Sequence, residues 1–339
     1  MKTYCLSVIL FFTMPVLSHA QKEAPLRLVQ TIPLPDLKEG DFDHFTVDLE
    51  GHRLFLTAEK NSAVEVFDLN ANKLIHTVTG LDEPHSMLYR ADLKKFFVVD
   101  GGAAGVRMYD SGSYKYLGEI KLKDDCDSNA YDPATKYLYV VNGGRGAHEP
   151  YTLISIIDTM AAKKIADIKI ETDSVEALAL EKSGPRLFVN ITGLNSVGVF
   201  DREKRSLLAT WSIVQEAQHN GPLAFDEANH RLFLATTAKP EKFVVVDSDT
   251  GKVITSMPSV SVADEISYDA KNKRIYVAGD QSVYVFQQQD PDHYTMLAKV
   301  PGSFRAKTAL LVPELNRYYL AVPRHGDEQA EVRVYSVMP

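Results

Sequence analysis

Residues 53–58 read RLFLTA, and this phrase, a polar residue followed by alternating apolar and aromatic residues, recurs along the chain. Its further copies are KFFVVD at 95–100, KYLYVV at 136–141, RLFVNI at 186–191, RLFLAT at 231–236, RIYVAG at 274–279 and RYYLAV at 317–322. Measured from the central aromatic residue of each copy, the spacings are 42, 42, 49, 45, 43 and 43 residues. A nearly constant period of this length indicates a repeat architecture, here with seven units.

Each unit contains four short apolar runs separated by Gly, Asn and Asp. In the first unit these runs are HFTVD at 44–48, RLFLTA at 53–58, AVEVFDL at 63–69 and KLIHTVT at 73–79. Val, Ile, Phe and Tyr dominate with a period near two, which is typical of β-strands. Sheets of this size bury both faces when they pack radially around an axis. The sequence therefore predicts an all-β fold, a seven-bladed β-propeller with four-stranded blades.

The two ends of the chain together complete the count. The last unit has three strand patterns, TALLVPE at 308–314, RYYLAV at 317–322 and EVRVYSV at 331–337. LRLVQTIPL at 26–34 is similar to the fourth run of other units. We expect this N-terminal strand, 26–34, to complete the last blade and close the ring, so that residues 21–339 form one domain.

The first twenty residues have the pattern of a secretory signal peptide. Lys2 precedes an apolar run at 4–17, and Ser18-His19-Ala20 supplies small residues for cleavage after Ala20. We therefore expect a secreted or periplasmic protein. Without Cys5 the chain keeps a single cysteine, Cys126, which allows no internal disulfide bond.

Charge excludes some classes of partner. The full chain has 37 basic and 45 acidic residues and a net charge of −8; residues 1–20 carry one lysine and no acid, so the remainder carries −9. Nucleic acids and anionic membrane surfaces are bound through basic patches, and no basic run is present. We expect no nucleic-acid partner and no membrane insertion.

A column of polar residues marks the start of the innermost strands. Twelve residues before each aromatic marker stand Asp43, His85, Asp127, Glu176, Gly221, Asp264 and Lys307. His44, Asn220, Glu265 and Arg305 lie next to or near members of this column. Propeller geometry would bring all of them to one mouth of the central channel, where we expect a small molecule or a protein partner to bind. The alternative is that these are turn residues, since Asp and Asn are common at such positions.

A long loop adds two candidates. NGGRGAHEPY at 142–151 accounts for the longest spacing and carries Arg145 and His148. Long loops on rigid scaffolds often bind ligands, although this one is equally compatible with a surface insertion. The aspartates that end the third runs are instead interpreted as turn residues; they are Asp68, Asp110, Asp158, Asp201 and Asp247.

The repeat phrases, for example RLFLTAEKNSAVEVFDLNANKLIHTV at 53–78 and DEISYDAKNKRIYVAG at 264–279, resemble those of the YVTN-repeat, YncE-like β-propeller family. The resemblance spans the chain after the signal segment. It implies a β-propeller in the bacterial periplasm or outside the cell, and it implies no particular activity. The variable, loop-bearing blades depart from the repeat consensus.

Three functional hypotheses follow. The first is non-catalytic binding at the channel mouth. The second is a metal-dependent hydrolase or lactonase, in which Glu176, Asn220 and Asp264 would supply oxygen ligands to Ca²⁺ or another divalent cation, as in calcium propeller lactonases, and His44 or His85 would act as general base. The third, an accessory subunit of a redox enzyme, has no support in the sequence. With Trp211 as the single tryptophan, the docking motifs of quinoprotein propellers are missing, which argues against pyrroloquinoline quinone (PQQ).

Overall fold

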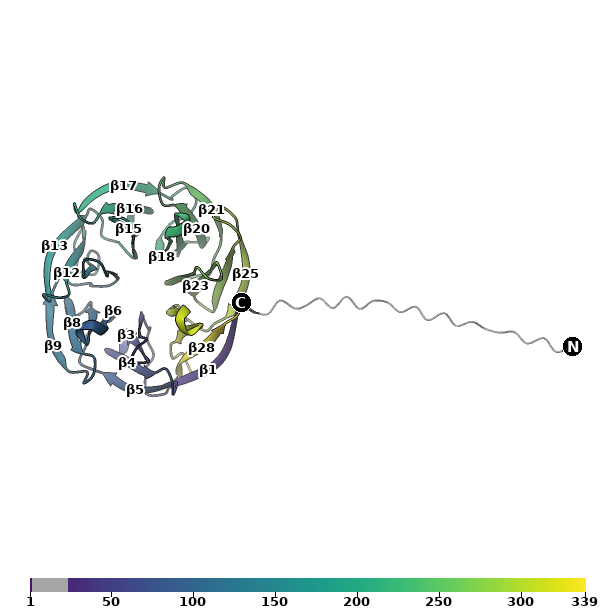
Figure 1. Ribbon diagram of the computed structural model, residues 1–339, viewed down its shortest axis with the longest axis horizontal. Coiled ribbons are helices and arrows are strands. Elements are labelled where there is room, and N and C mark those ends of the chain that lie inside the picture. The colour runs from purple at the N-terminus through teal and green to yellow at the C-terminus, as the bar shows by residue number, and fades with distance from the viewer. Residues whose placement is uncertain (2–23) are drawn as a thin grey trace.

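The computed structural model describes Met1 and residues 24–339, so the predicted signal peptide, 1–20, lies outside the described residues except for Met1. The described chain forms seven four-stranded antiparallel sheets arranged in a ring (Figure 1). The predicted all-β, seven-bladed propeller is thereby confirmed. The helices of the described residues are five 3-10 turns of three residues each, and none has the length and hydrophobicity that a bilayer crossing requires.

Each blade follows the chain from its innermost strand outward. The strands of the first four blades are β2 Phe45–Asp48, β3 Arg53–Ala58, β4 Ala63–Asp68 and β5 Lys73–Val78; β6 Pro84–Arg90, β7 Lys95–Asp100, β8 Gly105–Asp110 and β9 Tyr116–Lys121; β10 Asn129–Asp132, β11 Tyr137–Gly143, β12 Thr152–Asp158 and β13 Lys163–Ile170; and β14 Leu178–Leu180, β15 Arg186–Ile191, β16 Ser196–Asp201 and β17 Ser206–Ser212. Those of the last three are β18 Asn220–Asp226, β19 Arg231–Thr236, β20 Lys242–Asp247 and β21 Val253–Pro258; β22 Glu265–Asp269, β23 Arg274–Gly279, β24 Ser282–Gln288 and β25 Tyr294–Pro301; and β26 Ala309–Val312, β27 Arg317–Val322, β28 Ala330–Val337 and β1 Leu26–Leu34.

The N-terminal strand closes the ring, as the sequence predicted. β1 pairs antiparallel with β28 from Leu26 opposite Val337 to Leu34 opposite Ala330, and the purple β1 lies beside the yellow β28 in Figure 1. The Met338 amide also donates to the Pro25 carbonyl at 2.9 Å. The first and last strands of the propeller are therefore hydrogen-bonded neighbours in one sheet.

A shared irregularity identifies β1 as a fourth strand. In every blade the ladder between the third and fourth strands skips one residue of the fourth strand, and the skipped residues are Ile75, Leu117, Ile165, Leu208, Ile254, Leu297 and, in β1, Val29. A bulge of this kind increases the local twist of a sheet. β1 thus repeats the backbone geometry of the other six outer strands.

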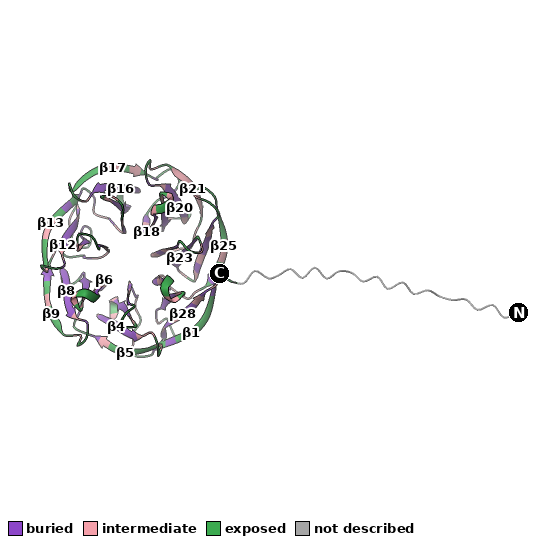
Figure 2. Ribbon diagram, viewed as in Figure 1, coloured by how far each residue is buried: buried purple, intermediate pink, exposed green. Residues whose placement is uncertain are grey.

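The core lies between neighbouring blades. The central aromatic residue of each repeat phrase is at most 2% exposed. Among the strands, the exposed residues lie mainly on the outermost strand of each blade (Figure 2). Rings also contact each other from one blade to the next: Phe243 stacks on Phe286 with centroids 4.3 Å apart, and Tyr276 packs at a tilt against Tyr318 at 5.3 Å. The recurring aromatic phrase is therefore the packing unit of the fold.

The aspartates that end the third strands act as turn residues, as predicted. Asp68 Oδ1 accepts the amides of Asn70 and Ala71, both at 2.8 Å, which is an Asx-type turn. The same two contacts recur at Asp110, Asp158, Asp201 and Asp247. Their carboxylates are occupied in holding the turns between the third and fourth strands.

Because β1 closes the ring, we expect alanine substitutions at its buried and its exposed residues to change the free energy of unfolding by different amounts. Ile32, which is 3% exposed, packs in the core between the last and first blades, whereas Val29 is 45% exposed. Ile32→Ala should lower the free energy of unfolding by about 2–4 kcal/mol, because it removes buried atoms and leaves a cavity. Val29→Ala, the control on the same strand, should cost less than about 1 kcal/mol. Urea unfolding of both variants measures the difference, and equal small losses would contradict a stabilising role for this strand.

Candidate functional site

The starts of the innermost strands meet in one cavity at the axis of the ring. It has a volume of about 300 Å³, and among its lining residues are all seven members of the column inferred from the sequence, Asp43, His85, Asp127, Glu176, Gly221, Asp264 and Lys307. His44 and Glu265 line it too. We call this cavity the channel mouth.

The sheet ladder explains why these residues converge. The amides of Asp43, Asp127, Glu176 and Asp264 each donate to a carbonyl near the end of the second strand of their own blade, at 3.0–3.3 Å. The four residues therefore occupy one ladder position in four blades. Because the blades are arranged radially, residues at the same ladder position in different blades lie at the same level along the axis and face one another across it.

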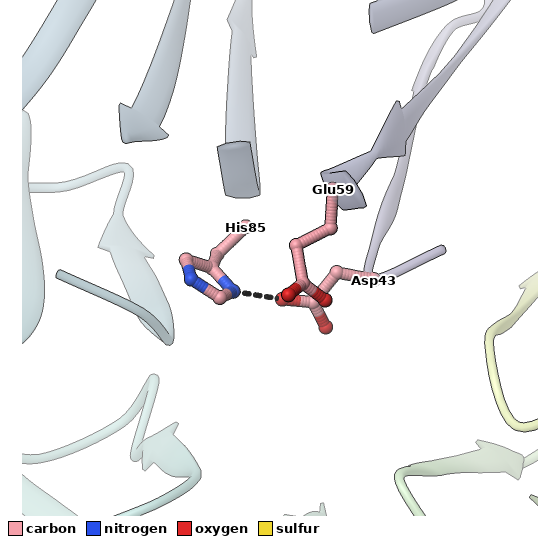
Figure 3. Close-up of side chains that lie close together, drawn as sticks. All are labelled: Asp43, Glu59 and His85. Carbon is pink, nitrogen blue, oxygen red and sulfur yellow. Dashed lines mark hydrogen bonds and ion pairs between the residues drawn. The ribbon is translucent and has the colours of Figure 1, made fainter. Parts of the chain in front are cut away.

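On one side of the mouth, a carboxylate is shared between two histidines. Asp43 Oδ1 lies 2.8 Å from His44 Nδ1. Asp43 Oδ2 lies 2.5 Å from His85 Nδ1, the contact drawn in Figure 3. Burial by itself would raise the pKa of Asp43, but the two histidines hold it well below its usual value. Burial would likewise lower the histidine pKa values, yet Asp43 raises the pKa of His44 to about 10, and Asp43 with Asp127 raises that of His85 to about 9. Both imidazoles are therefore protonated at neutral pH.

A second ion pair occupies the neighbouring wall. Lys307 Nζ lies 2.6 Å from Asp264 Oδ2. Burial opposes the charge of this lysine, but Asp264 and Asp43 raise its pKa. Together with the histidines, Lys307 accounts for the basic groups that line the mouth.

Three acids at the mouth lack such close partners. Within the described residues, no lysine, arginine or histidine lies within 4 Å of Glu176 or Glu265, and the nearest such contact of Asp127 is His85 Nδ1 at 3.8 Å. Burial and the surrounding carboxylates raise the pKa of Glu176 to about 8, that of Glu265 to about 7 and that of Asp127 to about 6. This part of the mouth therefore holds carboxyl groups that no basic group of the protein pairs closely and that share protons near neutral pH.

An apolar wall adjoins these acids. Ala177 and Leu178 follow Glu176 in the fourth blade, and Pro222 and Leu223 follow Gly221 in the fifth. Gly221 adds no side chain to the mouth, so the fifth blade contributes no charge from the column. A ligand at the mouth would therefore meet both carboxylates and aliphatic carbon.

Glu59 also lines the mouth, although it was not among the residues predicted from the sequence. It directly follows β3, lines the cavity and lies close to Asp43 and His85 (Figure 3). One ligand atom from each of these three residues lies within 4.8 Å of the other two, as a metal site would require. The sequence position of Glu59 could have predicted this location, because the loop after the second strand of a blade lies on the same face of the ring as the start of the first strand. Lys60 Nζ lies 2.6 Å from Glu59 Oε1.

Four predicted residues lie outside the mouth. Asn220 is fully buried and donates through Nδ2 to the Ser196 carbonyl at 2.9 Å, because adjacent side chains of a strand alternate and Gly221 takes the inward position. Arg305 Nε donates to Asp41 Oδ1 at 2.9 Å. Arg145 is exposed beside Asp173, on a smaller cavity that also touches Asp127 and Glu176, and His148 is exposed with φ 56°.

The calcium ligand set inferred from the sequence is therefore not assembled. Glu176 and Asp264 line the mouth, but Asn220 does not, and Asp264 is paired with Lys307. The donors that do converge are Asp43, Glu59 and His85.

Cys126 is buried away from solvent, and burial raises the pKa of its thiol, which suits a core residue and not a reactive one.

Comparisons with known proteins place the fold and no more. No protein-family model and no curated protein matches the chain. Among solved structures, a chain of hydrazine synthase from Kuenenia stuttgartiensis is similar with a TM-score of 0.70 and 17% identity, over 82% of this chain and 91% of that one. A chain of a mitotic checkpoint complex is similar with a TM-score of 0.76 and 13% identity over the full length of both. At these identities the likeness shows a shared β-propeller fold alone.

The shared carboxylate makes a prediction for the two histidines. NMR titration should give midpoints near 10 for His44 and 9 for His85, against about 6.5 for a free histidine. Because both hold protons more tightly in the folded protein, their contribution to stability is complete below about pH 6.5 and is lost as the pH rises through 9 to 10. Asp43→Asn should move both midpoints down, since burial then dominates, whereas Asp158→Asn at a distant turn should leave them unchanged. Midpoints near 6.5 in the natural protein would contradict the arrangement.

Proposed function

We propose that this protein is a secreted or periplasmic β-propeller that binds a positively charged ligand at its channel mouth and does not transform it. The observation that carries the proposal is the pair Glu176 and Glu265, which line the mouth with no lysine, arginine or histidine of the described residues within 4 Å, beside Asp127, whose nearest such group is His85 at 3.8 Å. Neighbouring carboxylates repel one another until a cation relieves them. β-Propellers commonly serve as rigid scaffolds for binding, which agrees with this role.

The chemistry of the mouth narrows the ligand to an organic cation with some apolar surface. Leu178, Pro222 and Leu223 offer aliphatic contact next to the free carboxylates. A small amine or the basic side chain of a protein partner would present that combination. The secretory pattern of residues 1–20 supports a location outside the cytoplasm, and the repeat phrases support membership of the YVTN-repeat, YncE-like group.

Calorimetry with 1,4-diaminobutane tests this proposal. At about 0.15 M salt, where exposed charges are screened, saturable binding should persist. Glu176→Gln and Asp127→Asn should each weaken it at least tenfold, because each removes a charge-assisted contact. Glu314→Gln, an exposed acid between β26 and β27, is the control and should have no effect.

Proton release makes the test specific. Glu176 and Glu265 have pKa values of about 8 and 7, so both are partly protonated at pH 7.5 and must lose protons when a cation binds. Titrations in buffers of different ionisation enthalpy should therefore show net proton release, which Glu176→Gln reduces. Binding that releases no protons and is insensitive to Glu176→Gln would contradict the proposal.

A divalent metal at Asp43, Glu59 and His85 is the second candidate, favoured by the convergence of their ligand atoms within 4.8 Å. Two carboxylates and an imidazole suit zinc or manganese better than calcium, which prefers oxygen ligands. His85 would have to give up its proton to bind the metal. A bound metal could polarise a carbonyl group, as the hydrolase or lactonase alternative requires.

Metal analysis separates the two candidates. If the metal site exists, Zn²⁺ should bind stoichiometrically, and Glu59→Gln or His85→Gln should each lower its affinity at least tenfold, whereas Glu176→Gln should have a smaller effect. Turnover of lactone or ester substrates that requires the metal would then support the hydrolase. Zn²⁺ binding that is equal in all variants would contradict this site.

A further inference from the structure

The outer strand of the fourth blade, β17, ends its sheet, and within the described chain one of its two edges has no hydrogen-bonded neighbour. β17 lies on the outer rim of the ring (Figure 1), and most of its residues are exposed (Figure 2). An open edge presents unpaired amide and carbonyl groups to which another strand can add. Every blade has such an edge, so the seven outer strands can be compared for the residues that protect them.

Six of the seven outer strands contain residues that oppose the addition of a strand. Charged side chains repel a partner, proline removes a donor, and glycine weakens a strand. These residues are Arg27 and Pro33 in β1, Lys73 in β5, Gly118, Glu119 and Lys121 in β9, Lys163, Lys164, Asp167 and Lys169 in β13, Pro258 in β21, and Lys299 and Pro301 in β25. β17 reads SLLATWS and contains no residue of these kinds. Its bulge at Leu208 is shared by all seven outer strands and does not distinguish it.

The exposed surface of β17 is uncharged and largely apolar. Leu207 is 54% exposed and Leu208 is 53% exposed, which makes them the two most exposed leucines of the described residues. Thr210 and Ser212 are exposed as well. β21 is also uncharged, but none of its residues before Pro258 is exposed. An exposed, uncharged strand edge with apolar side chains is the kind of edge that pairs with a further strand most readily.

Charge indicates which strand would add to this edge. Antiparallel pairing of β17 with a second β17 places no like charges opposite each other along the strand. The flanking residues are complementary: Lys204 and Arg205 precede β17, Glu216 follows it, and all three are exposed. Within the part of the chain that the structure describes, Arg205 has no acidic partner within 4 Å and Glu216 has no basic one. Antiparallel alignment brings Lys204 and Arg205 of one copy to the same end of the paired strands as Glu216 of the other.

We propose that two copies of this chain associate through antiparallel pairing of their β17 edges, so that their fourth blades join into one continuous sheet. Because each chain contributes one such edge, the contact is two-fold symmetric and closes at a dimer. Leu207 and Leu208 of each copy are then covered by the other copy. The channel mouth lies at the axis and includes no residue of β17, so the dimer is independent of the proposed cation binding.

Sedimentation velocity over a range of protein concentrations tests the proposal. The protein should show a reversible equilibrium between monomer and dimer. Leu208→Lys should weaken the dimer by about tenfold or more, because like charges then meet across the two-fold axis. Leu117→Lys is the matched control: it adds the same charge at the equivalent bulge of β9, where Leu117 is 48% exposed, and should leave the dimer unchanged.

Two further measurements show whether β17 pairs with itself. At concentrations where the dimer dominates, the amides of residues 206–212 should exchange with solvent about tenfold or more slowly than in dilute protein, because pairing protects them. The amides of β9 should exchange equally in both samples. Mixing Leu208→Lys with Leu208→Glu should restore a dimer of the two variants, since opposite charges then meet across the paired strands.

Three results would overturn the proposal. The first is a protein that stays monomeric up to about 0.5 mM, a range in which small interfaces already associate. The second is a dimer that Leu208→Lys and Leu117→Lys weaken equally, and the third is a dimer without slower exchange at residues 206–212; both would place the contact elsewhere. Circular dichroism of both lysine variants confirms that they are folded, as expected for substitutions at exposed residues.

Discussion

The antiparallel pairing of β1 with β28 is the contact on which the rest of the molecule depends. The last blade reaches four strands only through this pairing, because its outermost strand comes from residues 26–34, before the first blade. The long loop that this contact closes costs conformational entropy, which the buried residues of both strands must offset. Ile32 and Leu34 of β1 accordingly pack in one cluster with Phe42, Phe45 and Leu54 of the first blade.

Closure also explains two cavities, one at the axis and one where the last blade meets the first. At the axis, residues that share a ladder position in different blades are brought within hydrogen-bond distance of one another, as Asp43 and His85 are. At the junction, the crossover that leads from β1 into the first blade leaves a space beside Glu65. Both places contain a carboxylate that the protein pairs only in part, but Glu65 at the junction is closed off from solvent, whereas the acids at the mouth line an open cavity. The two differ in setting, since the mouth combines six acids with three basic groups and the junction isolates a single buried one.

The distribution of charge at the mouth follows a simple electrostatic rule. Asp43 and Asp264 each have a cation within 3 Å and need no ligand, whereas Glu176 and Glu265 have none within 4 Å. The same burial that lowers the histidine pKa raises the carboxyl pKa, and the sign of the net shift in each case depends on which partner is closest. The raised values of Glu176 and Glu265 mark the part of the mouth where added positive charge is most favourable.

The sequence by itself determined the blade count, the order of the strands and the closing role of residues 26–34, because a repeated alternation of apolar residues is a local property that every unit displays. It also placed the column of Asp43, His85, Asp127 and Glu176, since equal spacing from a buried marker means an equal position in each blade. Only the tertiary structure decided which neighbours face the axis: Asn220 and Gly221 are adjacent in sequence, yet side-chain alternation buries the first and leaves the second at the mouth. Glu59 at the mouth and the free oxygen of Glu65 likewise depend on which residues of other strands and blades lie opposite them, and that is information that no single repeat contains.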